Sequence, residues 1–269
     1  METTSGNVRI AMSSQAVVIE GLSKKYPSPS GFGQFAVIES LSLQISSGSF
    51  ASIVGPSGCG KSTLLNIIAG IEPHDSGEVR IATQNGAQSQ ARIGYVFQSP
   101  RLLNWLTVED NLKFALEAQN IGRAIWGERV RKYLDMVGLA GQERNFPLKL
   151  SGGMQQRVAI ARALAIEPDI LLMDEPFSHL DEITARKMRV DLMHILERAQ
   201  PTILFVTHSL REAVFLSEEV YMMSVKPARI FKHLRVNIPR PREPEDPRLF
   251  DLEKDLVKEF YTVLEQDQR

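Results

Sequence analysis

The sequence has very little cysteine and no long apolar run. Cys59 is the only cysteine among 269 residues, which excludes an internal disulfide framework and fits a reducing compartment. No stretch approaches the roughly 18 consecutive apolar residues of a membrane-spanning helix, so any membrane role has to come through a partner. Residues 1–15 are polar and contain no apolar core of signal-peptide length, and we expect them to be disordered.

An excess of charge of either sign is also missing. Lys and Arg number 31 and Asp and Glu number 32, which leaves a net charge of −1. No global basic field therefore attracts nucleic acid or anionic lipid, and we expect no nucleic-acid partner. The length suits one large α/β domain, or a domain with an inserted lobe.

Strand and helix patterns alternate along most of the chain. Strand-like runs at 16–20, 35–45 and 50–54, with the turn Ser46-Ser47-Gly48 before the last, predict an N-terminal antiparallel meander. Further strands are predicted at 78–82, 93–97, 170–173 and 202–206, and helices at 62–69, 154–165, 184–198 and 210–216. This alternation predicts an α/β fold with a mainly parallel sheet and helices on both faces.

Two segments differ from this alternation. Helical patterns at 112–118 and 126–137, the first after the capping-box pattern Thr107-Val108-Glu109-Asp110, predict an inserted α-helical lobe of about residues 98–148. The proline- and arginine-rich residues 239–247 predict a linker between a domain of residues 16–238 and a C-terminal helix within 239–269. That helix either packs on its own domain or contacts a partner, through residues at helical spacing: Leu249, Leu252, Leu256, Phe260 and Leu264.

A phosphate-binding loop is the clearest chemical signal. It has the eight-position pattern, with a strand before it and a helix after it: Gly55, Pro56, Ser57, Gly58, Cys59, Gly60, Lys61 and Ser62, followed by Thr63. Such glycines let backbone N–H groups and the helix N-terminus surround the phosphates. Lys61 would reach the β- and γ-phosphates, and the Ser62 hydroxyl would bind Mg²⁺. The same amides could lower the pKa of Cys59, or the thiol is buried and unreactive.

Polar residues follow three of the predicted strands. Asp174 and Glu175 end the strand at 170–173, where a doubly wound sheet places its ligands. Asp174 is the expected Mg²⁺ partner, and Glu175 is placed to act as a general base or to position the attacking water. His208, just before the capping-box pattern from Ser209 to Glu212, is expected at the γ-phosphate. Gln98 ends the strand at 93–97, where its amide would bridge Mg²⁺ or the attacking water.

A second glycine-rich helix start lies far along the chain from the phosphate loop. Ser151, Gly152 and Gly153, followed by Gln155, leave N–H groups free at the positive end of a helix. One ATP cannot fill two such cradles that lie far apart in one chain. Two chains arranged head-to-tail about a two-fold axis would bring each cradle to the other chain's γ-phosphate.

Over residues 16–235 the chain resembles the ABC transporter ATPases, through the phosphate loop, Gln98, residues 150–156, Asp174-Glu175, Ser178-His179-Leu180-Asp181 and His208. The resemblance implies ATP and Mg²⁺ as cofactors, and Asp181 as the residue that signals across the dimer. It also implies that Tyr26 stacks on adenine. Without the resemblance, Tyr26 could equally well be an ordinary aromatic residue at the surface.

The resemblance further implies a second ATPase subunit, membrane permease subunits, and indirectly a solute-binding protein, at the cytoplasmic face of the cell membrane. Residues 98–112 and the Pro-Arg-rich tail look most like the importers of nitrate, sulfonate, taurine and bicarbonate. The chain departs from its relatives at Asn104, at His179 and in residues 83–91. The alternative is a soluble ABC-type ATPase of translation or DNA repair. A phosphoryl-transfer kinase would leave residues 150–156 unexplained.

Overall fold

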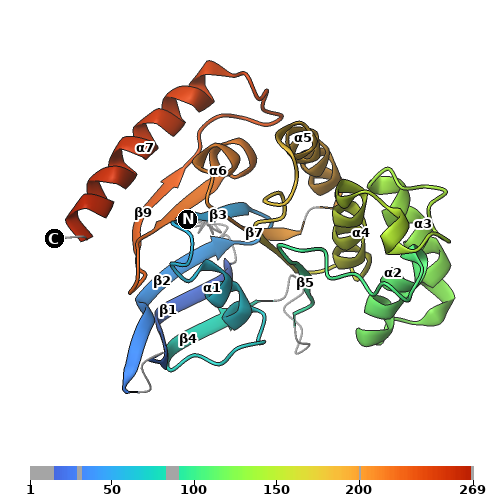
Figure 1. Ribbon diagram of the computed structural model, residues 1–269, viewed down its shortest axis with the longest axis horizontal. Coiled ribbons are helices and arrows are strands. Elements are labelled where there is room, and N and C mark those ends of the chain that lie inside the picture. Colours follow the sequence, from blue (N-terminus) through green and yellow to red (C-terminus); the bar gives the residue numbers. More distant parts are fainter. Residues whose placement is uncertain (1–14, 29–31, 83–90, 200, 268–269) are drawn as a thin grey trace, which may run out of the picture.

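Two sheets organise the structure, a computed structural model that describes residues 15–28, 32–82, 91–199 and 201–267 (Figure 1). The larger sheet has six strands in the order β5-β6-β7-β3-β8-β9. Its parallel strands are β3 (Phe50–Val54), β5 (Ile93–Val96), β6 (Ile170–Asp174), β7 (Thr202–Thr207) and β8 (Glu219–Met223), and β9 (Ile230–Arg235) adds an antiparallel edge. The central strands are buried along their whole length, as their continuous apolar sequences require.

The smaller sheet is antiparallel and has the order β2-β1-β4, with β1 (Gln15–Pro27), β2 (Gln34–Ser46) and β4 (Ser76–Ile81). The prediction that β3 continues this sheet as a meander is wrong. After the Gly48 turn, β3 enters the middle of the larger sheet, where Ile203 N–H donates to Ser49 O at 2.9 Å. Because β3 is apolar on both faces, it needs the two-sided burial that only a central strand has.

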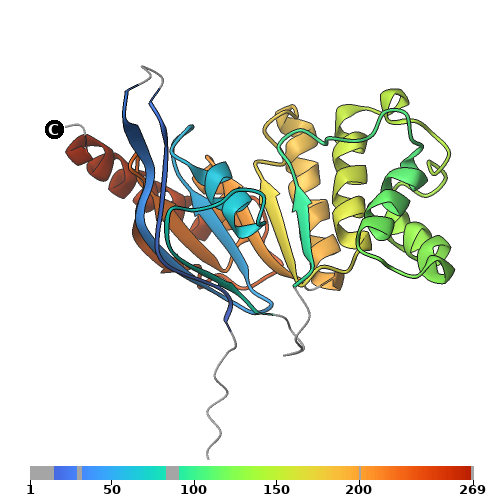
Figure 2. The same cartoon turned by 90° about the horizontal axis from the view of Figure 1, so that it is seen from below.

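Each face of the larger sheet has its own hydrophobic core. Along β6, Ile170 and Leu172 belong to one core and Leu171 and Met173 to the other, as strand alternation dictates. The first core holds α1 (Lys61–Ile68), which lies between the two sheets (Figures 1 and 2). The second core is covered by helices: α4 (Gly152–Ala165), α5 (Glu182–Ala199), α6 (Leu210–Leu216) and α7 (Pro247–Asp267).

The predicted helical segment lies beyond α4, at the end of the molecule away from the smaller sheet (Figure 2). It contains α2 (Val108–Ala118), α3 (Trp126–Met136) and two short 3-10 turns, at Arg123–Ile125 and Pro147–Lys149. The predicted cap of α2 is confirmed, because the Thr107 hydroxyl accepts from Asp110 N–H at 3.2 Å. None of the described helices is long and apolar enough to cross a membrane.

Residues 236–246 connect β9 to α7 without helix or strand, but two arginines in this connection bond to the domain. Arg242 is only 5% exposed and donates to carbonyl groups at the end of α6, and Arg240 donates to Leu216 O at 2.6 Å. The segment is therefore attached to the domain. It leads into α7, whose Leu249 and Leu256 are buried in the second core, so the helix packs on its own chain. The side chain of Leu264, residues 1–14 and residues 83–90 lie outside the described part of the chain.

Candidate functional site

The predicted catalytic and metal-binding residues come together at one edge of the larger sheet. The phosphate loop follows β3, Gln98 follows β5, Asp174 and Glu175 end β6, and His208 follows β7. These four strands are parallel neighbours in the order β5-β6-β7-β3, so their carboxyl ends meet at the same edge. Residues separated by more than 150 positions in the chain thereby surround one site.

The phosphate loop has the backbone geometry of an anion cradle. Gly58 and Gly60 adopt positive φ values of 75° and 121°, which side-chain-bearing residues rarely adopt. A Cβ at Gly60 would lie 2.8 Å from Val37 Cγ1, whereas a Cβ at Gly58 would meet nothing within 4 Å. The loop therefore packs tightly where it joins α1 and stays open at Gly58, where the N-terminus of α1 can receive a phosphate group.

Lys61 is buried beneath this loop, with an exposed fraction of 4%. Its ammonium group donates to Gly55 O and Pro56 O, at 2.9 Å each, and lies 3.4 Å from Glu175 Oε1. A buried cation of this kind needs anionic or carbonyl partners. The arrangement places one positive charge between the loop and the carboxylates that end β6.

Asp174 and Ser62 provide the oxygen atoms that a magnesium ion prefers. Burial raises the pKa of Asp174, although a hydrogen bond with Ser62 opposes the shift, and the neighbouring Glu175 raises the pKa further. A bound cation would relieve this unfavourable pair of carboxylates. Among the residues that the structure describes, no group of three or more His, Cys, Asp or Glu side chains gathers to hold a metal. The set fits Mg²⁺, which commonly keeps water and phosphate oxygens around one or two protein ligands.

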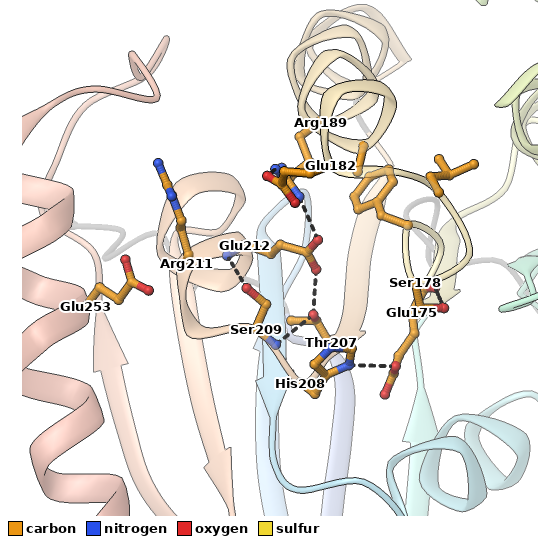
Figure 3. Close-up of a pocket in the computed structure, with 13 residues that line it drawn as sticks. Glu175, Ser178, Glu182, Arg189, Thr207, His208, Ser209, Arg211, Glu212 and Glu253 are labelled. Atoms are coloured by element: carbon orange, nitrogen blue, oxygen red, sulfur yellow. Dashed lines mark hydrogen bonds and ion pairs between the residues drawn. The ribbon is translucent and has the colours of Figure 1, made fainter.

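Glu175 and His208 face each other across the ends of two neighbouring strands (Figure 3). His208 Nδ1 and Glu175 Oε2 are 2.8 Å apart, and Glu175 N–H donates to Val206 O at 2.9 Å. Glu175 has a positive φ of 42°, a strained conformation for a residue with a side chain. Together with Phe177, Ser178 and other neighbours, the pair lines a pocket of about 400 Å³.

Gln98 and Tyr26 contact different parts of this site. Gln98 Nε2 donates to Ser178 Oγ at 3.2 Å, and Ser178 Oγ donates to Glu175 O at 3.0 Å, so the amide joins the segment that follows β6. The Tyr26 hydroxyl lies 3.4 Å from Thr63 Oγ1, in the first turn of α1. Burial raises the pKa of Tyr26.

Residues 151–155 lie apart from the phosphate loop. In the described part of the chain, no hydrogen bond joins them to residues 55–62. Ser151 caps α4 by accepting from Met154 N–H at 3.3 Å, and the Gln155 amide donates to Pro147 O and Leu150 O. Gly152 is exposed and Gly153 is half-buried, and their N–H groups lie in the same first turn of α4, where the Ser151 side chain accepts from Met154 N–H alone.

Asp181 lies close to this helix start. A Cβ on Gly152 would lie 4.0 Å from Leu180 and one on Gly153 would lie 3.0 Å from Thr184, so the two segments adjoin. Asp181 is exposed and accepts from Thr184 N–H at 3.0 Å, which caps α5. Backbone and side-chain hydrogen bonds with Thr184 lower the pKa of Asp181.

The suggestion that Cys59 has a lowered pKa is wrong. Burial raises the pKa of this thiol more than the nearby Lys61 lowers it, and the residue is 3% exposed. The thiol lies against the backbone of Gly55, since a Cβ there would be 3.0 Å from Sγ. It fills space inside the loop, which is the other alternative that the sequence left open.

Sequence reasoning missed three residues behind His208. Thr207, Glu212 and Arg189 form a row of hydrogen bonds that begins directly beside His208 (Figure 3). One signal was available in the sequence: the buried strand ends in a threonine, and a buried hydroxyl needs a partner. The identity of that partner depended on how α5 packs.

Comparisons with known proteins agree with this geometry. Residues 38–178 match the ABC transporter family. The chain is 43% identical to the aliphatic sulfonates import ATP-binding protein SsuB 2 of Burkholderia cenocepacia, over 85% of this chain and 83% of the relative. It is 38% identical to SsuB of Bacillus cereus, over 91% and 95%.

Solved structures resemble it as well. The dimeric structure of MJ0796, described as a bacterial ABC transporter cassette, superposes with a TM-score of 0.70 at 31% identity, covering 83% of this chain and 100% of that one. A post-hydrolysis state of the same cassette, bound to ADP and Pi, gives a TM-score of 0.69 at 32% identity, with the same coverage.

Proposed function

This chain belongs to the ABC transporter family and is an ATPase, and from that premise we propose that it powers the uptake of a small anion through a membrane permease. The observation that carries the proposal is the contact of Lys61, Glu175 and His208 at the carboxyl edge of the sheet. The three groups lie beside a phosphate loop, and together they provide a cation for the phosphates, a carboxylate for the attacking water, and a second polar contact for the γ-phosphate.

Each of these groups has a proposed part in hydrolysis. The loop amides and Lys61 bind the β- and γ-phosphates, and Tyr26 stacks on adenine. Glu175 orients the attacking water and accepts its proton, while His208 holds Glu175 and donates to the γ-phosphate. Ser62, Asp174 and Gln98 are the residues that would hold Mg²⁺. When bound, this ion neutralises charge that develops on the phosphates.

We place the second half of the site on another copy of the ATPase, identical or paralogous. The first-turn amides of Gly152 and Gly153, which Ser151 does not cap, are separate from the chain's own phosphate loop, and Gly152 is exposed. A head-to-tail pair would bring them to the partner's γ-phosphate, with Gln155 supporting the segment and Asp181 at the contact between the chains. The related cassette MJ0796 was solved as a dimer, which supports this arrangement.

A permease is the proposed membrane partner, with a solute-binding protein acting through it. The surface that follows Gln98 is suited to such a contact, because Trp105 is 73% and Phe114 is 53% exposed. Phe114 borders a groove of about 330 Å³ together with Phe97, Arg101 and Leu103. The ATPase would thus lie on the cytoplasmic face of the membrane, and ATP-driven closure of the pair would move the permease.

The proposed cargo is an anion of the nitrate, sulfonate, taurine or bicarbonate class, and aliphatic sulfonates are the first choice. Two relatives that match most of the chain are named as aliphatic sulfonates import proteins. The same names do not favour a soluble ATPase of translation or DNA repair. Uptake of a sulfonate as sulfur source by cells with and without the gene would decide the cargo.

One variant tests the proposed role of Glu175. Glu175→Gln should bind ATP and form a stable dimer while hydrolysis falls by about 10²–10⁴-fold, the range for general acid–base catalysis. Turnover that stays at the wild-type rate would remove Glu175 from this role.

Mixing two inactive subunits tests the shared geometry. Ser151→Arg leaves its own phosphate loop intact, and Lys61→Ala leaves its own α4 start intact. In a head-to-tail mixed dimer both lesions fall in one site, so the other site should trap nucleotide and hydrolyse it. If each chain instead contained a whole site, mixing would restore nothing.

A further inference from the structure

Thr207 ends β7 with a buried hydroxyl group, and its exposed fraction is 1%. The hydroxyl donates to Glu212 Oε2 at 2.5 Å and accepts from Ser209 N–H at 3.0 Å. These two bonds reach across His208, because Thr207 precedes it and Ser209 follows it. The backbone on both sides of His208 is therefore held by one hydroxyl.

Glu212 departs from the capping-box geometry that its spacing predicts. Its N–H donates to Ser209 Oγ at 3.3 Å, as expected for a capped helix. Its carboxylate does not return to Ser209 N–H, since Thr207 occupies that position. The carboxylate points instead to Arg189 Nη1 on α5, at 3.0 Å. Both side chains are only 13% exposed, so the ion pair is largely shielded from water.

Arg189 extends the connection to the segment that carries Glu175. Its Nη2 atom donates to Glu182 Oε1 at 2.7 Å, and Glu182 is the first residue of α5. Only residues 176–181 separate Glu175 from that helix. Arg189 and Glu212 therefore tie the segment after Glu175 to the segment after His208, behind the point where the two side chains meet (Figure 3).

We propose that Thr207, Glu212 and Arg189 are positioning residues that hold His208 against Glu175 for hydrolysis. Little else among the described side chains restrains His208, whose own side chain is 54% exposed and contacts Glu175. Bonds to charged groups are short and directional, so this row is suited to fixing a loop. The proposal rests on the proposed roles of Glu175 and His208.

The network should affect turnover more than ATP binding. None of its three side chains bonds to the phosphate loop within the described residues. Catalytic groups displaced by about 1 Å can lower a rate by up to about 10²-fold. We therefore expect a lower kcat for ATP hydrolysis with the KM for ATP little changed.

Thr207→Val and Thr207→Ser form the first test in the full chain. Valine keeps the shape and removes the hydroxyl, and serine keeps the hydroxyl. Thr207→Val should lower kcat by roughly 10- to 100-fold, and Thr207→Ser should stay close to wild type. The imidazole resonance of His208, assigned by its loss in His208→Gln, should shift in Thr207→Val and not in Thr207→Ser.

Arg189→Met provides a second test that leaves β7 unchanged, and Arg129→Met is its matched control. Arg129 on α3 is 15% exposed and donates to Glu167 at 2.6 Å, far from the sheet edge. Only Arg189→Met should move the His208 resonance and lower kcat. In a His208→Gln background, Arg189→Met should have no further effect on kcat, since it acts through His208.

Three results would overturn the proposal. The His208 resonance could stay unmoved in both Thr207→Val and Arg189→Met, or Arg129→Met could lower kcat as much as Arg189→Met does. The third is that Arg189→Met lowers kcat in the His208→Gln background by as much as in the wild type. Failure of the proposed function would look different. Glu175→Gln would then keep its turnover, whatever happens to the His208 resonance in the network variants.

Discussion

Arg242→Met removes a buried cation whose hydrogen-bond partners, in the described part of the chain, are all carbonyl groups. Arg242 Nη1 donates to Val214 O, Phe215 O and Ser217 O at 2.8, 3.1 and 2.7 Å, and Nε donates to Ile238 O at 2.9 Å. The first three acceptors lie at the C-terminal end of α6, where helix carbonyls have no partners within the helix. The arginine therefore caps the helix that follows His208.

The size of the effect follows from these bonds. Each carbonyl that stays buried and unpaired costs about 1–3 kcal/mol. Two factors reduce the sum. First, burial lowers the pKa of Arg242 to about 10, so the guanidinium group is still charged at neutral pH. Its burial therefore costs desolvation free energy, and methionine removes that cost. Second, a groove of about 400 Å³ beside Arg240 and Arg242 lets water reach some of the carbonyl groups that Arg242 would leave unpaired. We expect a net loss of about 2–4 kcal/mol.

Such a loss is a large part of the roughly 5–15 kcal/mol by which native domains are stable. In a domain of this size it corresponds to a decrease in Tm of roughly 5–15 °C. Thermal unfolding followed by circular dichroism, without nucleotide, measures it directly. Arg248→Met is the control, because Arg248 is 65% exposed in the first turn of α7 and pairs with Asp246. That variant should melt close to the wild-type temperature.

If Arg242→Met and Arg248→Met melt at the same temperature as the wild type, the cap reasoning fails. Residues 239–247 would then be the plain linker that their composition predicts, and the carbonyl groups of α6 would be satisfied by water alone.

Three further predictions concern the site and its surroundings. Because burial and Glu175 raise the pKa of Asp174, its charge costs stability at neutral pH, and this cost disappears as the pH falls through the raised pKa. Asp174→Asn should therefore raise the Tm of the nucleotide-free protein while losing the extra Mg²⁺-dependent stabilisation by ATP; a lower Tm would contradict this reasoning. Trp105→Glu should keep the fold and basal ATPase activity but uncouple transport in vesicles, whereas unfolding would mean that Trp105 is a core residue despite its 73% exposure. Maleimide should label Cys59 slowly with or without Mg-ATP, and rapidly after unfolding, because the thiol is buried and its pKa is raised; fast labelling of the native protein would refute this.

The strand-end residues were predictable because their signals are local. A phosphate loop needs a strand, glycines at positive φ, a lysine and a helix start within a few residues, and all of these are adjacent in the sequence. Asp174, Glu175 and His208 were found in the same way, as polar residues at the end of apolar runs. Their meeting at one edge follows from the rule that parallel strands align their carboxyl ends.

Strands β8 and β9 were not predicted, and the reason is the weakness of their local pattern. β8 begins with a glutamate that is buried in the fold, and β9 has only half-buried and exposed positions, which alternate in part of the strand. Glu219 is tolerated there because Tyr221 donates to it at 3.1 Å and Arg235 lies 3.4 Å away. Those partners exist only once the strands have paired.

The sequence by itself determined the proposed chemistry of this protein: which residues are expected to bind phosphate, which carboxylates accompany them, and which helix start is proposed to serve a second chain. Tertiary structure alone decided that β3 leaves the smaller sheet, that Arg242 caps α6, and that Arg189 of α5 bonds to Glu212 of α6 behind His208. The physical reason is how far apart in the sequence the interacting residues lie. Phosphate binding depends on backbone geometry set by neighbouring residues, whereas a buried arginine or carboxylate is stable only where packing brings a partner from a distant part of the chain.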